Sequence, residues 1–437
     1  MTRSVYPSDM NKTTPMEPGF YGLGIAPKLL EILASQGFSQ PSPIQHQSIP
    51  IALEGKDLIG VAQTGTGKTL AYCVPMIQRL AQVKGMGLII LPTRELALQA
   101  DETFRQIGSS IRLRTAVVIG GASQHVQVKQ LKKHPHVIIA TPGRLNDLLE
   151  QRLVSLKDVR VLVLDEADRM LDMGFLPQIN RILDAVPTDR QTMLFSATMP
   201  ASILKIAGER MKLPTQVEIA RPGTTAEGVT QELYIIPKEE KLELLERLLN
   251  ENRGSILVFT RTKHGAKKLA RSVRDMGHTA AEIHSNRSLS QRKEAIEGFK
   301  NGKYRVLVAT DIAARGIDVK GIEIVINFDL PEQADDYVHR IGRTARAGSV
   351  GRAISFATPD QRRDIRDIER LIQQQLPVSS SPTRSASTRT KTDRATTPRV
   401  SRRSDSPRSK RDAGGTNSRH RTARGRSSGS RKPRVHF

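Results

Sequence analysis

The sequence predicts two consecutive α/β domains, each built on a parallel sheet that helices cover on both faces. Short β-rich apolar runs alternate with helical patterns over about 350 residues, which is typical of α/β architecture. Runs such as VLVL at 161–164 show no alternation of inward and outward side chains, as expected for strands buried on both faces. The segment ARPGTTAEG at 220–228 is polar, contains Pro and Gly and has no periodicity, so we expect it to link the two domains.

The apolar runs fall into two series on either side of this segment. Strands are expected in the first half at 57–62, 87–92, 114–120, 136–142, 161–166 and 192–198. Strands are expected in the second half at 233–237, 255–260, 304–310, 322–328 and 353–358. The segment at 239–252 has the amphipathic pattern of a helix. The resulting division is an N-terminal extension at 1–19, domains at 20–219 and 229–376, a linker at 220–228 and a tail at 377–437.

The charge of the chain is strongly positive and unevenly distributed. Its 437 residues include 68 Lys+Arg and 44 Asp+Glu, a net charge of +24, which indicates a polyanionic partner, nucleic acid first and an anionic membrane surface second. The tail at 377–437 holds 17 basic and 3 acidic residues. A segment this polar cannot bury enough apolar surface to fold, so we predict a disordered arm that binds nucleic acid. A merely solubilising tail is the alternative.

Several protein classes are excluded by composition. No run approaches the roughly 18–20 apolar residues of a membrane span, so we expect no integral membrane protein and no membrane partner. The first 20 residues have no apolar segment of the kind found in secretory signals. The single cysteine, Cys73, allows neither an internal disulfide framework nor a Cys-rich zinc site. A reducing, cytoplasmic location is therefore expected.

A glycine-containing loop between an apolar strand and a helix predicts a nucleotide site. The pattern is Ala-x-x-x-x-Gly-Lys-Thr, whereas the usual phosphate loop starts with Gly. Backbone N–H groups of such a loop surround phosphates, Lys68 reaches the β and γ oxygens, and the Thr69 hydroxyl can bind Mg²⁺. The predicted loop residues are Ala62, Gln63, Thr64, Gly65, Thr66, Gly67, Lys68 and Thr69.

A carboxylate pair at the end of another strand supplies the second part of such a site. Asp165 follows the apolar run VLVL and can hold Mg²⁺ directly or through a water, while Glu166 can orient and deprotonate the attacking water. Taken alone, Asp-Glu-Ala-Asp could equally be an acidic helix start. Ser196 and Thr198 end a later strand, where small hydroxyl residues are ordinary loop chemistry.

Two arginines in the second half are spaced to contact one anion. Arg343 and Arg346 are three apart, on one face if helical. An isolated pair of this kind usually marks a basic surface helix. Beside a phosphate-loop domain, an arginine finger is the better interpretation, because the transition state needs a planar bidentate donor. This interpretation implies an ATP site in the cleft between two domains.

Taken in order, these motifs make residues 20–376 resemble the DEAD-box RNA helicases of superfamily 2. The resemblance implies two RecA-like domains, ATP and Mg²⁺ as cofactors, and RNA as the partner. It assigns Phe20 and Gln45 to adenine and Gly316 and Asp318 to the nucleotide, with Asp318 near the ribose. It assigns hydrolysis to Lys68, Asp165, Glu166, Arg343 and Arg346, and coupling to Asp168, Ser196, Thr198 and His339. The RNA contacts that it implies are Pro92, Thr93, Arg94, Gly121, Thr141, Pro142, Gly143, Arg144, Arg261, Gln291, Arg292, Thr310 and Asp311.

Departures from the family pattern are few. Ser42 stands where Thr is usual and keeps the hydroxyl, and Ala345 replaces a frequent Gly. HSN at 284–286 replaces the commoner His-Gly-Asp or His-Gly-Asn. The short N-terminus and the basic tail resemble the bacterial RhlE-like branch.

The expected activity is RNA-dependent hydrolysis of ATP coupled to local unwinding or remodelling of RNA duplexes and ribonucleoproteins. Scarce aromatic residues, 4% of the chain, predict RNA binding with little sequence preference. An ATP-gated RNA clamp with little unwinding would use the same residues. A non-catalytic nucleotide-binding scaffold should lack Lys68, Glu166 or one of the arginines, and this chain has them all. Ribosome-assembly and mRNA-decay complexes are both open as settings.

Overall fold

The computed structural model describes residues 19–63, 65–219, 228–314, 319, 321–345 and 350–379. Several predictions therefore lie outside the described residues. They concern Thr64, Gly316, Asp318, Arg346, residues 1–18 of the extension, residues 220–227 of the linker and the tail from residue 380.

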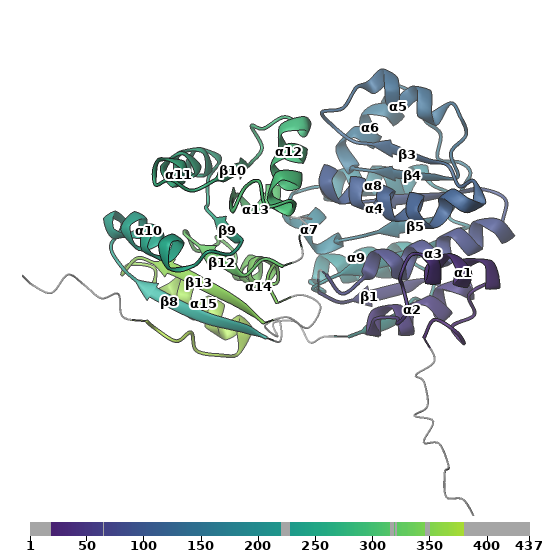
Figure 1. Ribbon diagram of the computed structural model, residues 1–437. Coiled ribbons are helices and arrows are strands. Elements are labelled where there is room, and N and C mark those ends of the chain that lie inside the picture. Colours follow the sequence, from purple (N-terminus) through teal and green to yellow (C-terminus); the bar gives the residue numbers. More distant parts are fainter. Residues whose placement is uncertain are drawn as a thin grey trace, which may run out of the picture. The chain divides into compact units, whose positions relative to one another are not determined.

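The first domain is built on a seven-stranded sheet in which every pairing is parallel (Figure 1). Its strand order is β3-β4-β2-β5-β6-β1-β7. The strands are β1 (Leu58–Val61), β2 (Met86–Ile90), β3 (Thr115–Val118), β4 (Val137–Ala140), β5 (Val159–Leu164), β6 (Gln191–Ser196) and β7 (Thr215–Glu218).

The second domain repeats this topology with six parallel strands in the order β10-β11-β9-β12-β13-β8. Leaving β7 aside, the two orders are the same, and β8 occupies the position of β1. The chain therefore carries the same fold twice. The strands are β8 (Val229–Ile235), β9 (Ile256–Phe259), β10 (Ala280–Ile283), β11 (Val306–Ala309), β12 (Ile324–Asn327) and β13 (Gly351–Ala357).

Helices connect the strands and cover both faces of each sheet (Figure 1). Those of the first domain are α1 (Pro27–Ser35), α2 (Pro43–Leu53), α3 (Lys68–Gln82), α4 (Arg94–Gly108), the 3₁₀ turn η1 (Ser109–Ile111), α5 (Gln124–Leu131), α6 (Pro142–Glu150), α7 (Ala167–Asp172), α8 (Leu176–Ala185) and α9 (Ala201–Arg210). Those of the second domain are the 3₁₀ turn η2 (Lys238–Glu240), α10 (Lys241–Glu251), α11 (Lys263–Asp275), α12 (Leu289–Lys300), α13 (Asp311–Ala314), α14 (Ala334–Ile341) and α15 (Arg362–Ile372).

Each sheet separates two apolar layers, which explains the strands without polar alternation. Along β6, Met193 and Phe195 pack with α1 to α4, whereas Leu194 packs with α6 to α9 on the opposite face. In β9, Val258 packs with α10 and α11, and Leu257 packs with α12 and α13. Helices α14 and α15 pack against β8 and β13. The predicted α/β class with parallel sheets is confirmed.

Two strands were not predicted from the sequence. β7 lies at an edge of its sheet, and only one of its four side chains is buried, so it has no apolar run. β10 reads Ala-Ala-Glu-Ile, and its buried Glu282 hides the strand from a search for hydrophobic residues. The helix expected at 239–252 is present as α10. Within the described residues, no helix combines the length and the apolar character that crossing a membrane requires.

Candidate functional site

The predicted nucleotide residues follow three strands that are neighbours in the first sheet. Ala62 comes directly after β1, Asp165 directly after β5, and Ser196 is the last residue of β6, which lies between them. All strands are parallel, so these residues share the carboxyl edge of the sheet. Ligands of open α/β sheets bind at that edge.

The phosphate loop has the backbone geometry that its glycines allow. Gly65 and Gly67 have φ of 90° and 89°, values that residues with a side chain rarely adopt. A Cβ at Gly67 would collide with Nε2 of Gln45. Lys68 begins α3, and its buried Nζ donates to the Ala62 carbonyl at 2.9 Å. The loop thus presents a helix N-terminus and an ammonium group, the two features that hold phosphates.

Gln45 joins the adenine motif to this loop. Its Nε2 donates to the Gly67 carbonyl at 3.0 Å, and its Oε1 accepts from the Ser42 backbone N–H at 2.9 Å. Phe20 is 4% exposed and packs into the core beside α1 and α2. Contact of Phe20 with adenine stays a prediction.

Asp165 is buried and hydrogen-bonded on both oxygens. The Tyr72 hydroxyl donates to Oδ2 at 3.1 Å, and the Glu166 backbone N–H donates to Oδ1 at 2.9 Å. Burial raises the pKa of Asp165 to about 6, although nearby Lys68 opposes the shift. Tyr72 also hydrogen-bonds Thr69, so the two predicted magnesium ligands meet at one hydroxyl group. Sequence reasoning missed Tyr72; its place one helical turn after Lys68 in α3 was the available signal.

This donor set fits magnesium. Mg²⁺ usually takes one or two protein oxygens and completes its shell with phosphates and waters. The Asp165 carboxylate and the Thr69 hydroxyl at the phosphate loop supply such a pair of protein oxygens. No cluster of three or more His, Cys, Asp or Glu side chains suited to a metal occurs in the described part of the chain.

Replacing Asp165 with asparagine should stabilise the metal-free protein. The folded pKa of about 6 lies above the ordinary value of 3.8. The ionised carboxyl therefore destabilises the folded protein, and this destabilisation increases as the pH rises from 4 to 6 and then stays constant. The expected gain at pH 7.5 is about 1–3 kcal/mol, and it should vanish near pH 4. Thermal unfolding without nucleotide or metal measures it.

The exposed Asp158 provides the control, because Asp158→Asn removes the same charge without changing a buried group. A gain for Asp165→Asn that does not depend on pH would contradict the assigned burial cost.

Glu166 combines a strained backbone with a carboxylate oxygen that lacks a hydrogen bond. Its φ is 51° in the left-handed region, where a non-glycine residue costs about 1–3 kcal/mol. The side chain is 3% exposed, and buried Oε2 has no hydrogen-bond partner among the described residues. The Arg169 guanidinium lies 3.6 Å away. A buried acceptor with a free lone pair is suited to hold a water and take its proton.

Asp168 and the end of β6 form one hydrogen-bonded unit. Asp168 Oδ2 accepts from the backbone N–H groups of Ala197 and Thr198 at 3.0 and 2.9 Å, and from the Thr198 hydroxyl at 3.0 Å. The Asp168 N–H donates to the Ser196 hydroxyl at 3.2 Å. The structure therefore brings three of the four predicted coupling residues together. Because of these hydrogen bonds, a displacement of α7 must also displace residues 196–198.

The three RNA motifs predicted in the first domain meet around one loop. The Arg94 guanidinium lies so close to Gly121 that a Cβ there would collide with Nη1. Arg144 donates to the carbonyl of Ala122 at 3.3 Å. Thr93 caps α4. Pro92 and Thr93 follow β2, Thr141 follows β4, and Pro142, Gly143 and Arg144 open α6, all at the carboxyl edge.

The RNA residues predicted in the second domain are more scattered. The Gln291 side chain accepts a hydrogen bond from the backbone N–H of Ser288, the first residue before α12. Thr310 begins the turn into α13. The Arg261 N–H donates to Asp329 Oδ2 at 3.1 Å. Arg292 is buried and pairs with Glu95 at 2.8 Å. RNA contact by these residues stays a prediction.

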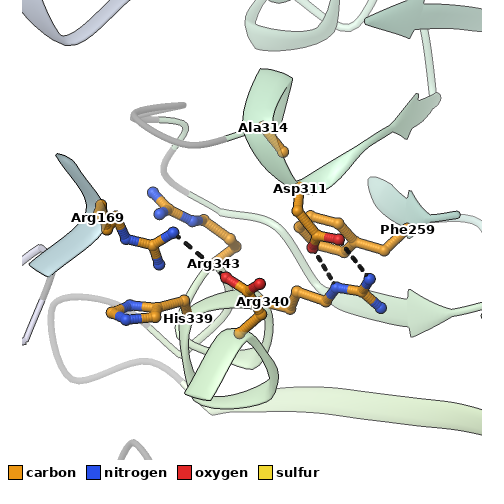
Figure 2. Close-up of a pocket in the computed structure, with 8 residues that line it drawn as sticks. Arg169, Phe259, Asp311, Ala314, His339, Arg340 and Arg343 are labelled. Carbon is orange, nitrogen blue, oxygen red and sulfur yellow. Dashed lines mark hydrogen bonds and ion pairs between the residues drawn. The ribbon is translucent and has the colours of Figure 1, made fainter. Parts of the chain in front are cut away.

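Arg340 is the main residue that sequence reasoning left without a role. It is 2% exposed, and its Nε and Nη2 donate to the two carboxylate oxygens of Asp311 (Figure 2). Its third nitrogen donates to Asn327 and to the Asp329 carbonyl, and the guanidinium lies 5.0 Å from the Phe259 ring centre. Arg340 therefore fixes the orientation of the side chain of Asp311, a predicted RNA contact.

His339 and Arg343, the coupling and catalytic residues predicted in this region, line the same pocket as Arg340 (Figure 2). Arg169 of α7 also lines it and lies 3.5 Å from Asp336. The pocket is thus lined both by the segment that follows the Asp-Glu-Ala-Asp motif and by residues of the motif that begins on α14.

Comparison with known proteins identifies both halves of the chain. The family model described as DEAD/DEAH box helicase matches residues 42–206, and the model described as helicase conserved C-terminal domain matches residues 240–348. Together they include the phosphate loop, the Asp-Glu-Ala-Asp motif and the motif on α14.

Curated relatives and solved structures agree. The chain is 43% identical over 369 residues to the ATP-dependent rRNA helicase RRP3 of Debaryomyces hansenii, covering 84% of this chain and 77% of that protein. It is 41% identical over 367 residues to the DEAD-box ATP-dependent RNA helicase CshA of Bacillus cereus, with 83% and 70% covered. The structure of S. cerevisiae Dbp5 bound to RNA and ADP BeF3 is 29% identical and matches with a TM-score of 0.76, covering 83% and 95%. The two sheets are RecA-like helicase domains.

Proposed function

The chain belongs to the DEAD/DEAH box helicase family and is an ATP-dependent RNA helicase, and from this premise we propose that it couples ATP hydrolysis to local separation of RNA strands. The observation that carries the proposal is the Glu166 carboxylate, which is buried and has no hydrogen bond on Oε2 among the described residues, beside Asp165 and the Lys68 loop. A scaffold that only bound nucleotide would gain nothing from a buried carboxylate oxygen that has no hydrogen bond and only the Arg169 guanidinium at 3.6 Å to offset its charge, because burying such a group costs free energy.

The proposal assigns the following roles to the chain's residues. The loop at 62–69 binds the phosphates, Asp165 and Thr69 would hold Mg²⁺, and Glu166 orients water and accepts its proton. Magnesium, when bound, neutralises charge on the phosphates. Arg343 and Arg346 stabilise the charge of the transferred group. Asp168, with Ser196 and Thr198, transmits the state of the nucleotide to the RNA-facing loops.

ATP and RNA then favour each other's binding. If both ligands bind the same closed arrangement of the two domains, each raises the affinity for the other by the same factor. Release of phosphate removes the contact to Arg343 and Arg346, and RNA is freed. Bending of one strand in the groove separates it locally from its complement, without a requirement for translocation.

Unwinding at saturating ATP, measured against duplex length, tests this function. Local strand separation predicts a rate that falls steeply as the duplex lengthens, together with RNA-stimulated ATP hydrolysis. An ATP-gated clamp, the second candidate, predicts slow release of RNA and little unwinding even of short duplexes. Absence of RNA-stimulated hydrolysis would contradict both.

We further propose the domain division at 20–219 and 229–376, an RNA-tethering role for the tail at 377–437, and membership of the RhlE-like branch. The tail's 17 basic residues against 3 acidic ones support the tether. Work on ribosome assembly fits the rRNA helicase named among the relatives, and mRNA decay is a second setting. We also propose a cytoplasmic location, which the single cysteine of the chain favours.

Residues 377–379 hydrogen-bond to Leu233 of β8, so the predicted tail is part of the second domain up to residue 379. Deleting residues 380–437, which removes all 17 basic residues of the tail, should weaken RNA affinity and flatten its salt dependence while leaving ATP hydrolysis without RNA unchanged. Each phosphate that the tail no longer neutralises reduces the slope of log K against log salt by about 0.7 on single strands. Titrations at several salt concentrations measure it. An unchanged slope would remove the tail from RNA binding.

A further inference from the structure

A basic pocket lies at the amino edge of the first sheet, opposite the nucleotide loop. It has a volume of about 620 Å³. It is formed where chain segments enter β1, β5, β6 and β7 and where α3 ends. Its charged lining residues are Lys56, Asp57, Arg79, Arg160, Asp189, Arg190 and Lys212, five cations against two carboxylates.

The guanidinium groups of this pocket are poorly compensated. Within the part of the chain that the structure describes, Arg79, Arg160 and Arg190 form no ion pair with a carboxylate; their hydrogen bonds go to an amide side chain or to backbone carbonyls. The Nε atoms of Arg79 and Arg190 are buried and have no hydrogen-bond partner there. A buried donor left unpaired costs about 1–3 kcal/mol.

The two carboxylates of the pocket are already engaged. Both oxygens of Asp57 accept backbone N–H groups, from Thr192 at 2.7 Å and Lys212 at 2.6 Å. Asp189 lies 3.6 Å from Lys212 in an exposed pair, which contributes little. Lys56 forms an exposed pair with Glu54 at 2.6 Å, so the positive charge that lines the pocket without an ion pair is that of the three arginines. Burial lowers the pKa of Arg190, and Asp57 only partly offsets this effect.

We propose that this pocket is a second RNA-binding site, which holds the sugar-phosphate backbone of a single strand flanking the duplex. Guanidinium forks with free N–H donors match phosphate oxygens in a bidentate manner. The inference rests on the proposed function, because it takes RNA as the polyanion that the protein encounters. The strands of the sheet span about 13–20 Å, so only RNA that extends beyond the groove at the carboxyl edge can reach the pocket.

The double variant R79Q/R160Q tests the site in the full chain. Arg190 is kept, because it also holds the carbonyls of Pro187 and Arg210. K267Q/K268Q on α11 removes the same charge from exposed positions of the other domain and is the matched control. R79K/R160K keeps the charge and loses the planar fork.

Binding is measured with a single strand of about 8 nucleotides and with the same strand extended by about 20 on its 5′ or 3′ side. R79Q/R160Q should bind the short strand as the wild type does, with unchanged RNA-stimulated ATP hydrolysis. It should lose about 3–10-fold affinity for one of the extended strands, with a salt slope about 1.4 shallower, as expected for two phosphates. R79K/R160K should recover only part of the loss.

Three results would overturn the site. One is equal binding of the extended strands by the wild type and R79Q/R160Q. Another is a loss no larger than that of K267Q/K268Q. The third is that R79Q/R160Q binds RNA as the wild type does but no longer binds polyglutamate, which the wild type binds. That result would assign the pocket to an acidic protein partner. Failure of the proposed function is separate, because it would abolish RNA-stimulated hydrolysis with the short strand in the wild type.

Discussion

Replacing Glu166 with glutamine should reduce the rate of RNA-stimulated ATP hydrolysis by about 10²–10⁴-fold, the usual contribution of a general base. Glutamine has nearly the same shape and can still orient a water, but it cannot take the proton. Asp165, Lys68 and the phosphate loop are unchanged, so binding of ATP and RNA should persist. Steady-state hydrolysis, together with nucleotide and RNA titrations, separates these two effects.

The environment of Glu166 makes this substitution more informative than most. The carboxylate is buried, one of its oxygens has no hydrogen bond among the described residues, and its backbone is held in the left-handed region by the turn from β5 into α7. Such strain persists only where the surrounding structure imposes it, and it concentrates at functional sites. The Arg169 guanidinium at 3.6 Å would lose a charged neighbour, so a modest change in stability is also expected.

The control is Glu150→Gln on α6, whose carboxylate forms an exposed pair with Arg181. It should leave hydrolysis unchanged, because exposed pairs contribute little and Glu150 is remote from the loop in the sequence. A Glu166→Gln enzyme within a few-fold of the wild-type rate would assign the base to another group. Loss of ATP binding in parallel with hydrolysis would indicate a structural role instead.

The sequence predicted the fold class and the position of the nucleotide loop because both depend on local patterns. A parallel sheet places every strand end at one edge, so motifs that follow strands, such as those at Ala62 and Asp165, must lie close together if the strands are neighbours. The order of the strands cannot be read from local patterns. The neighbouring positions of β1, β6 and β5 come from the structure alone.

What sequence reasoning missed depends on packing between distant segments. Tyr72 resembles any core aromatic residue of an amphipathic helix, and only the fold places its hydroxyl on Asp165. Strand β10 was missed because Glu282, buried among arginines, replaces the apolar residue that a strand pattern requires. Polar residues at buried positions are where pattern-based prediction fails.

Arg340 should be among the most sensitive positions of the second domain. Its guanidinium joins the carboxyl ends of three adjacent strands to α14: it pairs with Asp311 after β11, donates to Asn327 at the end of β12, and lies over Phe259 at the end of β9. Truncation to alanine leaves a carboxylate, an amide and a carbonyl without their donor. Removing one partner from a buried ion pair costs about 3–5 kcal/mol.

The expected result for Arg340→Ala is therefore a loss of about 3–5 kcal/mol in the free energy of unfolding of the second domain, measured by urea titration. Arg340→Lys keeps the charge but not the fork that spans both oxygens of Asp311, so its loss should be intermediate. Arg363→Ala on α15 is the control, since that side chain is 89% exposed and its removal should cost less than about 0.5 kcal/mol.

A double-mutant cycle with Asp311→Ala decides whether the ion pair is the cause. If it is, the sum of the losses in unfolding free energy of the two single variants should exceed the loss of the double variant by about 1–3 kcal/mol. The reason is that each single change leaves the other residue buried without its partner. Additive losses would mean that Arg340 acts mainly through Asn327, Asp329 and Phe259. His339 directly precedes Arg340 on α14, and Arg343 follows within one turn. A weakened anchor should therefore also lower hydrolysis at temperatures where the domain is still folded, and this loss should be smaller in Arg340→Lys than in Arg340→Ala.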